Sequence, residues 1–395
     1  MSDKIDRIPV APLALLPLKS IEPLTAEIDQ YIAASRKTRE NNFHDSPVFA
    51  GYVRDSYLIP AETPRFGSGE AKGHLLESVR GDDLYILVDV LNYSITYKLF
   101  GVPNRMSPDD HYQDLKRVIA ATTGKAKRIN VIMPFMYESR QHKRSSRESL
   151  DCAMMLQELH AMGVENFITF DAHDPRVMNA IPEDSFDNVP CAYQFIKALL
   201  CTYNDLVVDN KHMMIISPDE GGMGRAIYYA NVLGLDMGMF YKRRDYSKVV
   251  NGRNPIVAHE FLGANVEGMD VVIIDDMISS GESMVDTARE LKEMKARRVI
   301  ACTTFGLFTN GFEKFDKAYE EGIIDAIFTT NLIYQKPELL TKPWYHSVDM
   351  AKQVALLIDR LNHDESISDL LDNTLKIQTV LSDYRTGNMD CHRKH

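Results

Sequence analysis

One stretch, residues 271–283, limits what this chain can fold into. It begins with Val271–Ile274, four β-branched residues that are typical of a strand buried on both faces of a parallel sheet. Asp275 and Asp276 follow, and a run of small hydroxylated residues then leads into 284–296, whose apolar spacing predicts an amphipathic helix. We therefore expect an open α/β sheet, in which ligands bind at the carboxyl ends of the strands.

The same stretch predicts a ligand with a phosphate and neighbouring hydroxyl groups. A helix start offers unpaired N–H groups and a partial positive charge, which suit a phosphate. Asp275 and Asp276 repel a phosphate but suit hydroxyl groups or a divalent cation. A pentose 5-phosphate combines both features. A strand end followed by an ordinary helix cap at Ser279 or Ser280 explains these residues equally well, so other motifs have to decide.

Length, charge and cysteine content exclude several classes. The 395 residues suffice for two domains, and the net charge of -11 argues against nucleic acid as the main partner. The five cysteines are scattered and include no Cys-x-x-Cys pair, which favours a reducing compartment. The apolar run Val10–Leu16 is too short for a signal peptide or a membrane span. We expect a cytoplasmic protein without membrane attachment.

Further polar motifs follow other predicted strands. Arg65–Glu70 is a glycine turn whose aromatic ring can stack on a base and whose carboxylate can accept from an exocyclic amine. The basic segment 140–147 suits a polyphosphate in an acidic protein. His173 follows a predicted strand, is flanked by acids and suits a metal or phosphate contact. Asp219 lies in a strand, acid and glycine turn that resembles the Asp275 stretch, so this half is expected to be doubly wound. Taken singly, an ordinary turn, a solvated loop or a structural histidine explains each of them as well.

Lys242, Arg243 and Arg244 are three consecutive cations at the end of a predicted strand. The polar segment Asp245–Pro255 follows them, and we expect it to be a mobile flap that carries its cations over a reacting phosphate.

Taken together and in this order, from about residue 47 to residue 370, the motifs resemble the ribose-phosphate pyrophosphokinase family, the synthetases of 5-phosphoribosyl 1-pyrophosphate (PRPP). The matching stretches are Arg65–Glu70, Ser78–Gly81, Arg140-Gln141, the strand end at His173, Ser217–Asp219 with Gly221-Gly222, Lys242–Arg244 and Asp275–Ser283. The chain departs from the family pattern at Ser68, at His142, after His173 and at Glu282. It exceeds the usual family length at residues 1–45 and at residues 91–112, which we expect to be loop-like.

The resemblance implies a fold and a domain plan. We expect an α/β protein with two phosphoribosyltransferase-like domains, each a mostly parallel sheet flanked by helices. Residues 1–45 are predicted to be an N-terminal extension, and 372–395 a polar tail. The N-terminal domain, on the ATP side, is expected over 46–193 and completed by a helix at 348–371. The C-terminal domain, on the ribose 5-phosphate side, is expected over 194–347. A homo-oligomer built from dimers, such as a hexamer, is implied as well.

The resemblance also implies a reaction, in which ATP and ribose 5-phosphate give PRPP and AMP with Mg²⁺. Phe66, Ser68, Glu70, Arg140 and Gln141 are implied to bind ATP, with Phe66 and Glu70 reaching the adenine from a neighbouring subunit. His173 and Asp219 are implied metal ligands, Lys242 and Arg244 the implied catalytic residues, and Arg80 an implied contact of the diphosphate. The implied ribose 5-phosphate site consists of Asp275, Asp276, Ser279, Ser280, Gly281, Glu282 and Ser283.

Three other functions stay open. The Asp275 loop alone also fits a phosphoribosyltransferase that consumes PRPP, although the basic segment 242–244 favours the synthetase. A catalytically silent paralogue that regulates an active synthetase fits the unusual Glu282 and Ser68. A plain sugar-phosphate binding module leaves the basic segment unexplained.

Overall fold

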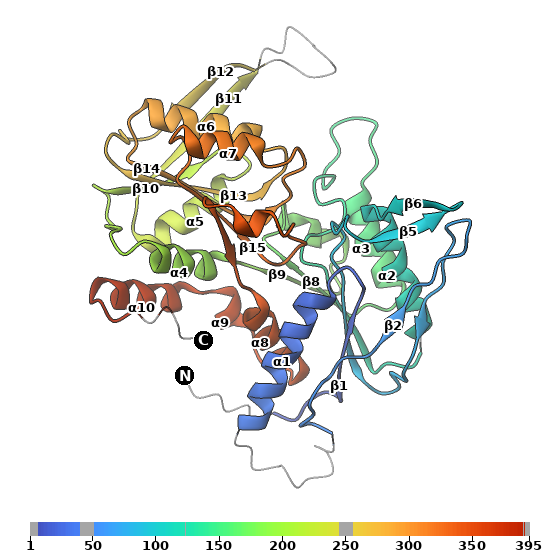
Figure 1. Ribbon diagram of the computed structural model, residues 1–395. Helices are drawn as coiled ribbons and strands as arrows, with labels where there is room; N and C mark the ends of the chain where they lie inside the picture. The colour runs from blue at the N-terminus through green and yellow to red at the C-terminus, as the bar shows by residue number, and fades with distance from the viewer. Residues whose placement is uncertain (1–6, 40–50, 123, 245–255, 390, 392–395) are drawn as a thin grey trace. The chain divides into compact units, whose positions relative to one another are not determined.

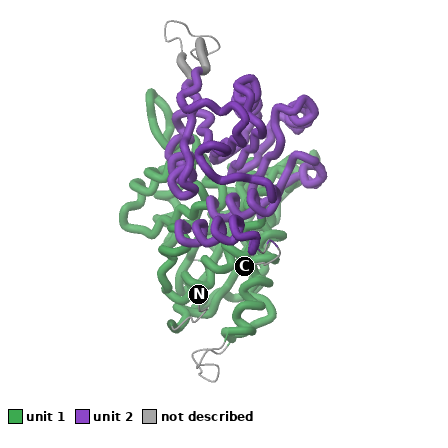
Figure 2. Tube along the Cα trace, turned by 90° about the vertical axis from the view of Figure 1, so that its left-hand side faces the viewer, with its two compact units in different colours: residues 1–190, 331–334, 349–372 green, residues 191–330, 335–348, 373–395 purple. Residues whose placement is uncertain are grey.

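The computed structural model describes residues 7–39, 51–122, 124–244, 256–389 and 391, with the side chains of 242–244 and 256–259 left out. The chain forms two compact units (Figure 2). Unit 1 comprises residues 1–190, 331–334 and 349–372, and unit 2 comprises 191–330, 335–348 and 373–395. The predicted boundary after residue 193 falls close to the observed one after Pro190.

Unit 1 is built on a five-stranded parallel sheet in the order β1-β4-β7-β8-β9 (Figure 1). β4, an interior strand of this sheet, is buried throughout, and all of its residues except Asp83 are apolar. The sheet strands are β1 (Leu13–Pro17), β4 (Asp83–Leu87), β7 (Arg128–Ile132), β8 (Asn166–Phe170) and β9 (Ser185–Val189). The helices are α1 (Glu22–Thr38), α2 (Pro108–Thr122), α3 (Asp151–Ala161), α8 (Ala351–Asn362) and α9 (Ser368–Leu371). Two small hairpins join β2 (Ala61–Glu62) to β3 (His74–Leu75) and β5 (Thr96–Leu99) to β6 (Val102–Arg105).

The prediction that residues 1–45 form an extension outside the N-terminal domain is wrong for β1 and α1. The edge strand β1 pairs in parallel with β4, and α1 packs against α8. Pro12 and Pro17 suggested an extended arm outside the fold. Pro12 precedes β1 and Pro17 ends it, and an edge strand tolerates proline at such positions. These residues therefore belong to the core of unit 1.

Unit 2 is built on a seven-stranded sheet in the order β12-β11-β10-β13-β14-β15-β16. All neighbouring pairs are parallel except β11 and β12. The strands are β10 (Met213–Ser217), β11 (Met237–Arg244), β12 (Ile256–Leu262), β13 (Asp270–Ile278), β14 (Arg298–Gly306), β15 (Ala326–Thr330) and β16 (Tyr345–Val348). The helices are α4 (Ala192–Thr202), α5 (Met223–Leu233), α6 (Glu282–Glu293), α7 (Glu313–Glu320) and α10 (Thr374–Arg385). The predicted architecture, two mostly parallel sheets flanked by helices, is confirmed.

Two further predictions need correction. Residues 91–112, expected to be loop-like, contain the β5–β6 hairpin and the start of α2. The expected polar tail contains α10, which buries Ile377 and Leu381. A disulfide joins Cys391 of this tail to Cys201 of α4, although the scattered cysteines favoured a reducing compartment. Among the described residues, no helix combines the length and the apolar character needed to cross a membrane.

Candidate active site

Asp275 and Asp276 lie in β13, between β10 and β14 in the middle of the unit 2 sheet. The sequence analysis predicted that both residues follow the strand. The strand instead continues past them to Ile278, so they are strand residues. Asp276 is buried and Asp275 is half-buried. The Asp276 N–H donates to Asp275 Oδ1 at 2.8 Å, and Arg225 Nη1 lies 3.7 Å from Asp276 Oδ1.

The electrostatics of this strand end favour a cation. Burial raises the pKa of Asp275 well above its usual range, and the negative charges of Asp276 and Asp219 raise it further. Three carboxylates therefore share one edge of the sheet, with Arg225 as a nearby positive charge. Such a set accepts hydrogen bonds from sugar hydroxyls and attracts a hard divalent ion.

The connection from β13 to α6 has the features of a phosphate loop. Gly281 is buried with a φ of 80°, in the left-handed region, and a Cβ there would lie 2.1 Å from Phe315 Cζ. Only glycine fits such a position. Gly281 is also the N-cap of α6 and offers no side-chain oxygen to the first helical N–H groups. A helix start of this kind suits a phosphate oxygen.

Glu282, the unusual residue of this loop, has a specific partner. Lys314 Nζ of α7 donates to Glu282 Oε1 at 3.1 Å. The Lys314 ammonium group compensates the negative charge of Glu282, which departs from the family pattern. The sequence alone did not indicate this pair.

Asp219 occupies the equivalent turn after β10. Its Oδ1 accepts hydrogen bonds from the N–H groups of Gly221 at 2.9 Å and Gly222 at 3.2 Å. A Cβ on Gly222 would lie 3.4 Å from the Ile274 carbonyl oxygen, so this turn packs closely against β13. The structure thus brings Asp219 next to the Asp275 loop.

Lys242 and Arg244 lie on a two-stranded ribbon. β11 pairs with β10 only over Met237–Met239 and continues to Arg244 alongside β12, with Lys242 opposite His259 (Figure 1). The ribbon therefore extends past the end of β10. The predicted flap, Asp245–Pro255, lies outside the described residues.

In unit 1, residues 65–70 form the predicted adenine loop, which lies in the connection from β2 to β3. The Phe66 N–H donates to the Glu70 carbonyl oxygen at 2.7 Å, which closes the loop. Ser68 Oγ donates to Glu70 Oε2 at 2.8 Å, and the Phe66 side chain is 57% exposed. Ser68, a departure from the family pattern, therefore orients the carboxylate that the prediction assigns to the adenine amine.

The connections after β7 and β8 meet at one edge of the unit 1 sheet. His142, next to Arg140-Gln141, packs edge-on against His173 with ring centroids 5.2 Å apart. His142 Nε2 also lies 3.4 Å from Asp174 Oδ2. Burial lowers the pKa of His142, and the neighbouring His173 contributes in the same direction while Asp174 opposes it. His142 therefore favours its neutral form, and its ring contacts that of His173. The sequence marked His142 as a departure but did not predict this contact.

Both connections contain strained backbone. Glu138 has a φ of 52° and Asp171 a φ of 37°, values that residues other than glycine rarely adopt. Such strain gathers at functional sites. Arg80, by contrast, precedes β4 and so lies at the opposite edge of the sheet from His173, and its role stays a prediction.

The residues present fit Mg²⁺ without forming a complete cage. No group of three or more His, Cys, Asp or Glu side chains among the described residues is arranged to hold an ion by itself. Mg²⁺ commonly binds one or two carboxylates together with substrate phosphates, and the oxygens of Asp219 and Asp275 are suitable donors. The predicted ligands His173 and Asp219 belong to different units, so their use by one ion stays a prediction.

Comparison with known proteins gives a consistent result. Residues 13–163 match a family model described as the N-terminal domain of ribose phosphate pyrophosphokinase, and residues 183–335 match the phosphoribosyl transferase domain. A ribose-phosphate pyrophosphokinase of Wolinella succinogenes is 28% identical over 333 residues, which cover 82% of this chain and 96% of that protein. One from Staphylococcus saprophyticus is 27% identical over 368 residues, which cover 91% and 97%.

The fold has a solved counterpart. The crystal structure of phosphoribosylpyrophosphate synthetase from Mycobacterium smegmatis superimposes with a TM-score of 0.69 at 19% identity, over 89% of this chain and 99% of that one. The match of the first family model begins at Leu13, in agreement with the place of β1 in the sheet. With both family models matched in order over most of the chain, this protein belongs to the ribose-phosphate pyrophosphokinase family.

Proposed function

We propose that the protein is a ribose-phosphate diphosphokinase, which transfers the diphosphoryl group of ATP to ribose 5-phosphate and so makes PRPP and AMP for nucleotide biosynthesis. The observation that carries this proposal is the edge of the unit 2 sheet. There the carboxylates of Asp219, Asp275 and Asp276 lie beside the glycine start of α6. This arrangement offers hydroxyl acceptors and a phosphate cradle side by side.

Ribose 5-phosphate takes the β13–α6 region. Asp275 and Asp276 accept hydrogen bonds from the ribose hydroxyls. The loop of Ser279, Ser280, Gly281, Glu282 and Ser283 holds the 5-phosphate, because its backbone leads into an uncapped helix start. Lys314 keeps the Glu282 carboxylate compensated while the phosphate is bound.

ATP takes residues of unit 1. Phe66 stacks on the adenine and Glu70 accepts from its amine, both reaching in from a neighbouring subunit of a homo-oligomer. Arg140 and Gln141 bind the nucleotide as well, next to the His142–His173 pair. His173 and Asp219 would hold Mg²⁺, which would supply positive charge to the ATP phosphates.

The transfer itself requires positioning and charge neutralisation more than a strong base. The anomeric oxygen of ribose 5-phosphate bonds to the β-phosphorus of ATP, the bond from that phosphorus to the α–β bridging oxygen breaks, and AMP leaves with that oxygen. The proton of the anomeric hydroxyl passes to solvent. Lys242 and Arg244, on the ribbon beyond the sheet, stabilise the charge that grows on the transferred group.

The test is a measurement of both products from purified protein with ATP, ribose 5-phosphate and Mg²⁺. The proposal expects AMP and PRPP at equal rates. PRPP consumption with a nucleobase acceptor would instead indicate a phosphoribosyltransferase. Absence of products, with ATP and ribose 5-phosphate still binding, would indicate a silent regulatory paralogue.

A further inference from the structure

The β5–β6 hairpin has a turn whose sequence does not suit its backbone. Leu99 pairs with Val102, and the two residues between them, Phe100 and Gly101, have φ values of 48° and 81°. A two-residue hairpin turn with two positive φ values prefers Asn-Gly, because a bulky side chain is strained in this region. Phe100 is also 81% exposed, so little packing within the chain compensates the strain.

The same turn is bonded to the predicted adenine loop, which lies more than 30 residues earlier in the sequence. The Phe100 N–H donates to the Gly67 carbonyl oxygen at 2.8 Å. A Cβ on Gly69 would lie 2.7 Å from Leu99 Cδ1, so the two turns are in close contact. The hairpin tip is therefore placed one residue from Phe66.

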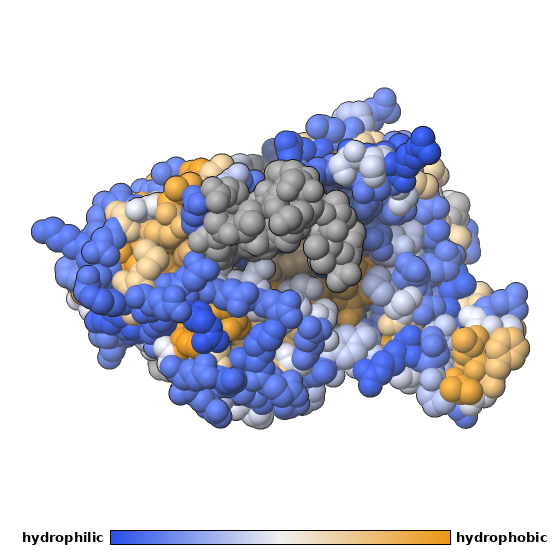
Figure 3. Space-filling model, turned by 90° about the horizontal axis from the view of Figure 1, so that it is seen from above, coloured by the Kyte–Doolittle hydropathy of each residue, from blue (hydrophilic) through white to orange (hydrophobic). Residues whose placement is uncertain are grey.

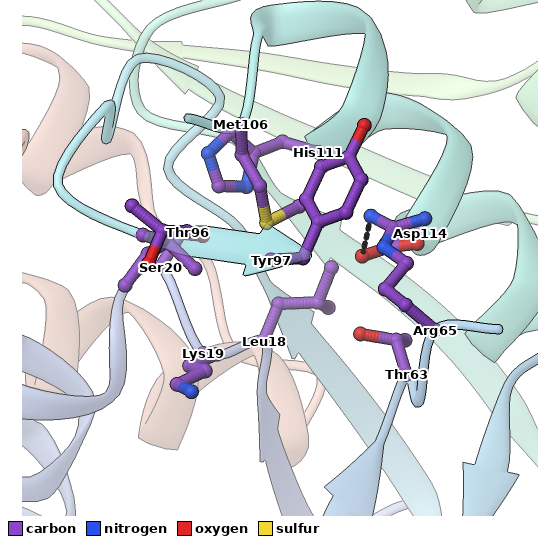
Figure 4. A pocket seen from close by; sticks show the side chains of 11 residues that line it. Leu18, Lys19, Ser20, Thr63, Arg65, Thr96, Tyr97, Met106, His111 and Asp114 are labelled. Atoms are coloured by element: carbon purple, nitrogen blue, oxygen red, sulfur yellow. Dashed lines mark hydrogen bonds and ion pairs between the residues drawn. The ribbon is translucent and has the colours of Figure 1, made fainter. Parts of the chain in front are cut away.

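A second attachment holds the start of the adenine loop. The guanidinium carbon of Arg65 lies 4.7 Å from the centre of the Tyr97 ring in β5, and Arg65 Nη2 donates to Asp114 Oδ2 of α2 at 2.7 Å. Behind these side chains lies a cavity of about 250 Å³, lined also by Met106 and His111 (Figure 4). The two contacts of Arg65 therefore anchor the start of the loop beside this cavity.

The loop and the hairpin tip share one apolar surface. Phe66, Phe100 and Val102 are 57%, 81% and 65% exposed. Figure 3 shows a compact apolar patch at its right-hand edge, the side on which Figure 1 draws β5 and β6. Two aromatic rings on neighbouring, hydrogen-bonded turns form a surface that suits a flat, apolar ring such as a nucleobase.

We propose that the β5–β6 hairpin is a second part of the nucleotide-recognition surface. Its tip holds the 66–70 loop in place and presents Phe100 as a second aromatic contact for the adenine of ATP held by another copy of this chain. The inference rests on the proposed function, from which it takes the identity of the ligand. It accounts for a strained, exposed phenylalanine at a position that asparagine suits better.

The variant Phe100→Asn tests the aromatic contact. Asn relieves the turn, so the midpoint of thermal unfolding rises by roughly 2–4 °C. The KM for ATP rises about five- to tenfold, because a stacking partner is lost. The KM for ribose 5-phosphate and kcat stay unchanged. Lys98→Thr, an exposed change on the same hairpin, serves as the control and leaves both KM values unchanged. A more stable Phe100→Asn protein with an unaltered KM for ATP would overturn this part of the proposal.

Tyr97 variants test the positioning role. Tyr97→Leu removes the ring beneath Arg65, so amide exchange in residues 65–70 becomes faster and the KM for ATP rises. Tyr97→Phe keeps the ring and restores both values. Exchange is measured without turnover, so it tests the positioning role even if the wild type makes no PRPP, the outcome that would refute the proposed function. Equal exchange in wild type and Tyr97→Leu would overturn the positioning role.

Discussion

Asp275 shows how a single residue can favour binding over stability. Its folded-state pKa is raised above the usual value of 3.8, so the folded protein holds the proton more tightly than the unfolded chain does. Stability therefore falls as the pH rises from 3.8 through the raised pKa, and the ionised carboxylate is destabilising at neutral pH. A bound cation or sugar offsets this cost, which places the residue in the functional site.

Replacing Asp275 by Asn should consequently stabilise the protein and inactivate it. We expect the free energy of unfolding at pH 7.5 to rise by about 1–3 kcal/mol, with little change at pH 4. We expect kcat/KM to fall by roughly two powers of ten or more. Denaturant titrations at the two pH values and PRPP formation measure both effects. Asp286→Asn, an exposed change on α6, is the control. Equal stabilisation at both pH values would contradict the assigned cause.

The pair of Glu282 and Lys314 permits a double-mutant test at the same scale. Lys314→Ala leaves the carboxylate uncompensated beside the 5-phosphate, so the KM for ribose 5-phosphate should rise about two- to fivefold, the range of an exposed ion pair. Glu282→Gln should lower it, and the double variant should resemble Glu282→Gln alone. Steady-state kinetics with varied ribose 5-phosphate measure these values. Additive effects of the two changes would mean that the residues act independently.

At the scale of elements, the β11–β12 ribbon carries the two predicted catalytic cations. It extends past β10 and carries Lys242 and Arg244 to the end of the described part of β11. Lys242→Ala should lower kcat by about two to three powers of ten and change the KM for either substrate by less than about threefold, because the cation acts on the transition state. Lys211→Ala, an exposed lysine just before β10, should leave kcat unchanged. A higher KM with normal kcat would make Lys242 a binding residue only.

The elements also show how far the sequence can be interpreted. The apolar run Val271–Ile274 predicted a buried parallel strand, because such a run has few other stable environments. The strand β1 was missed because prolines flank it, and proline at a sheet edge looks the same in sequence as proline in a loop. The β5–β6 hairpin was not predicted because its turn has the sequence Phe-Gly, whereas Asn-Gly is the usual signal of such a turn. That mismatch is itself the observation from which the nucleotide-recognition role of the hairpin is inferred.

Contacts between residues far apart in the sequence could not be predicted, because no local pattern marks them. The sequence predicted that Asp219 and Asp275 each follow a strand, but it did not predict that the two residues lie close together. It had no pattern for Glu282 with Lys314 or His142 with His173, because these pairs join loops whose paths depend on the whole unit. The Cys201–Cys391 disulfide spans 190 residues and likewise has no local signal.

At the scale of the whole molecule, unit 1 depends on contacts between segments that lie more than 300 residues apart in the sequence. Arg36 and Arg39, near the N-terminus, both bind the Asp359 carboxylate of α8, and Asn362 accepts from Arg36 at 2.7 Å. Arg36 and Asp359 are 1% and 3% exposed. Burial opposes ionisation of Asp359, but the two guanidinium groups lower its pKa below 3.8 overall. Its stabilisation is therefore present above pH 3.8 and lost as the pH falls further.

Asp359→Asn should then destabilise the protein by about 3–5 kcal/mol at pH 7, because it leaves two buried guanidinium groups without a counter-charge. The exposed pair of Lys37 and Asp55 provides a matched control, and Asp55→Asn should leave the free energy of unfolding almost unchanged. Thermal and denaturant unfolding measure both. Equal, small effects of the two changes would mean that the N-terminal segment is an appendage after all.

The central claim is that a diphosphoryl group moves as one piece from ATP to ribose 5-phosphate. The most direct test uses ATP labelled at the β-phosphorus, with the products separated after a single turnover. We predict that all transferred label appears in PRPP and that an equal amount of unlabelled AMP forms. Label recovered in ADP, with a singly phosphorylated sugar as the other product, would show transfer of one phosphoryl group and would contradict the assignment.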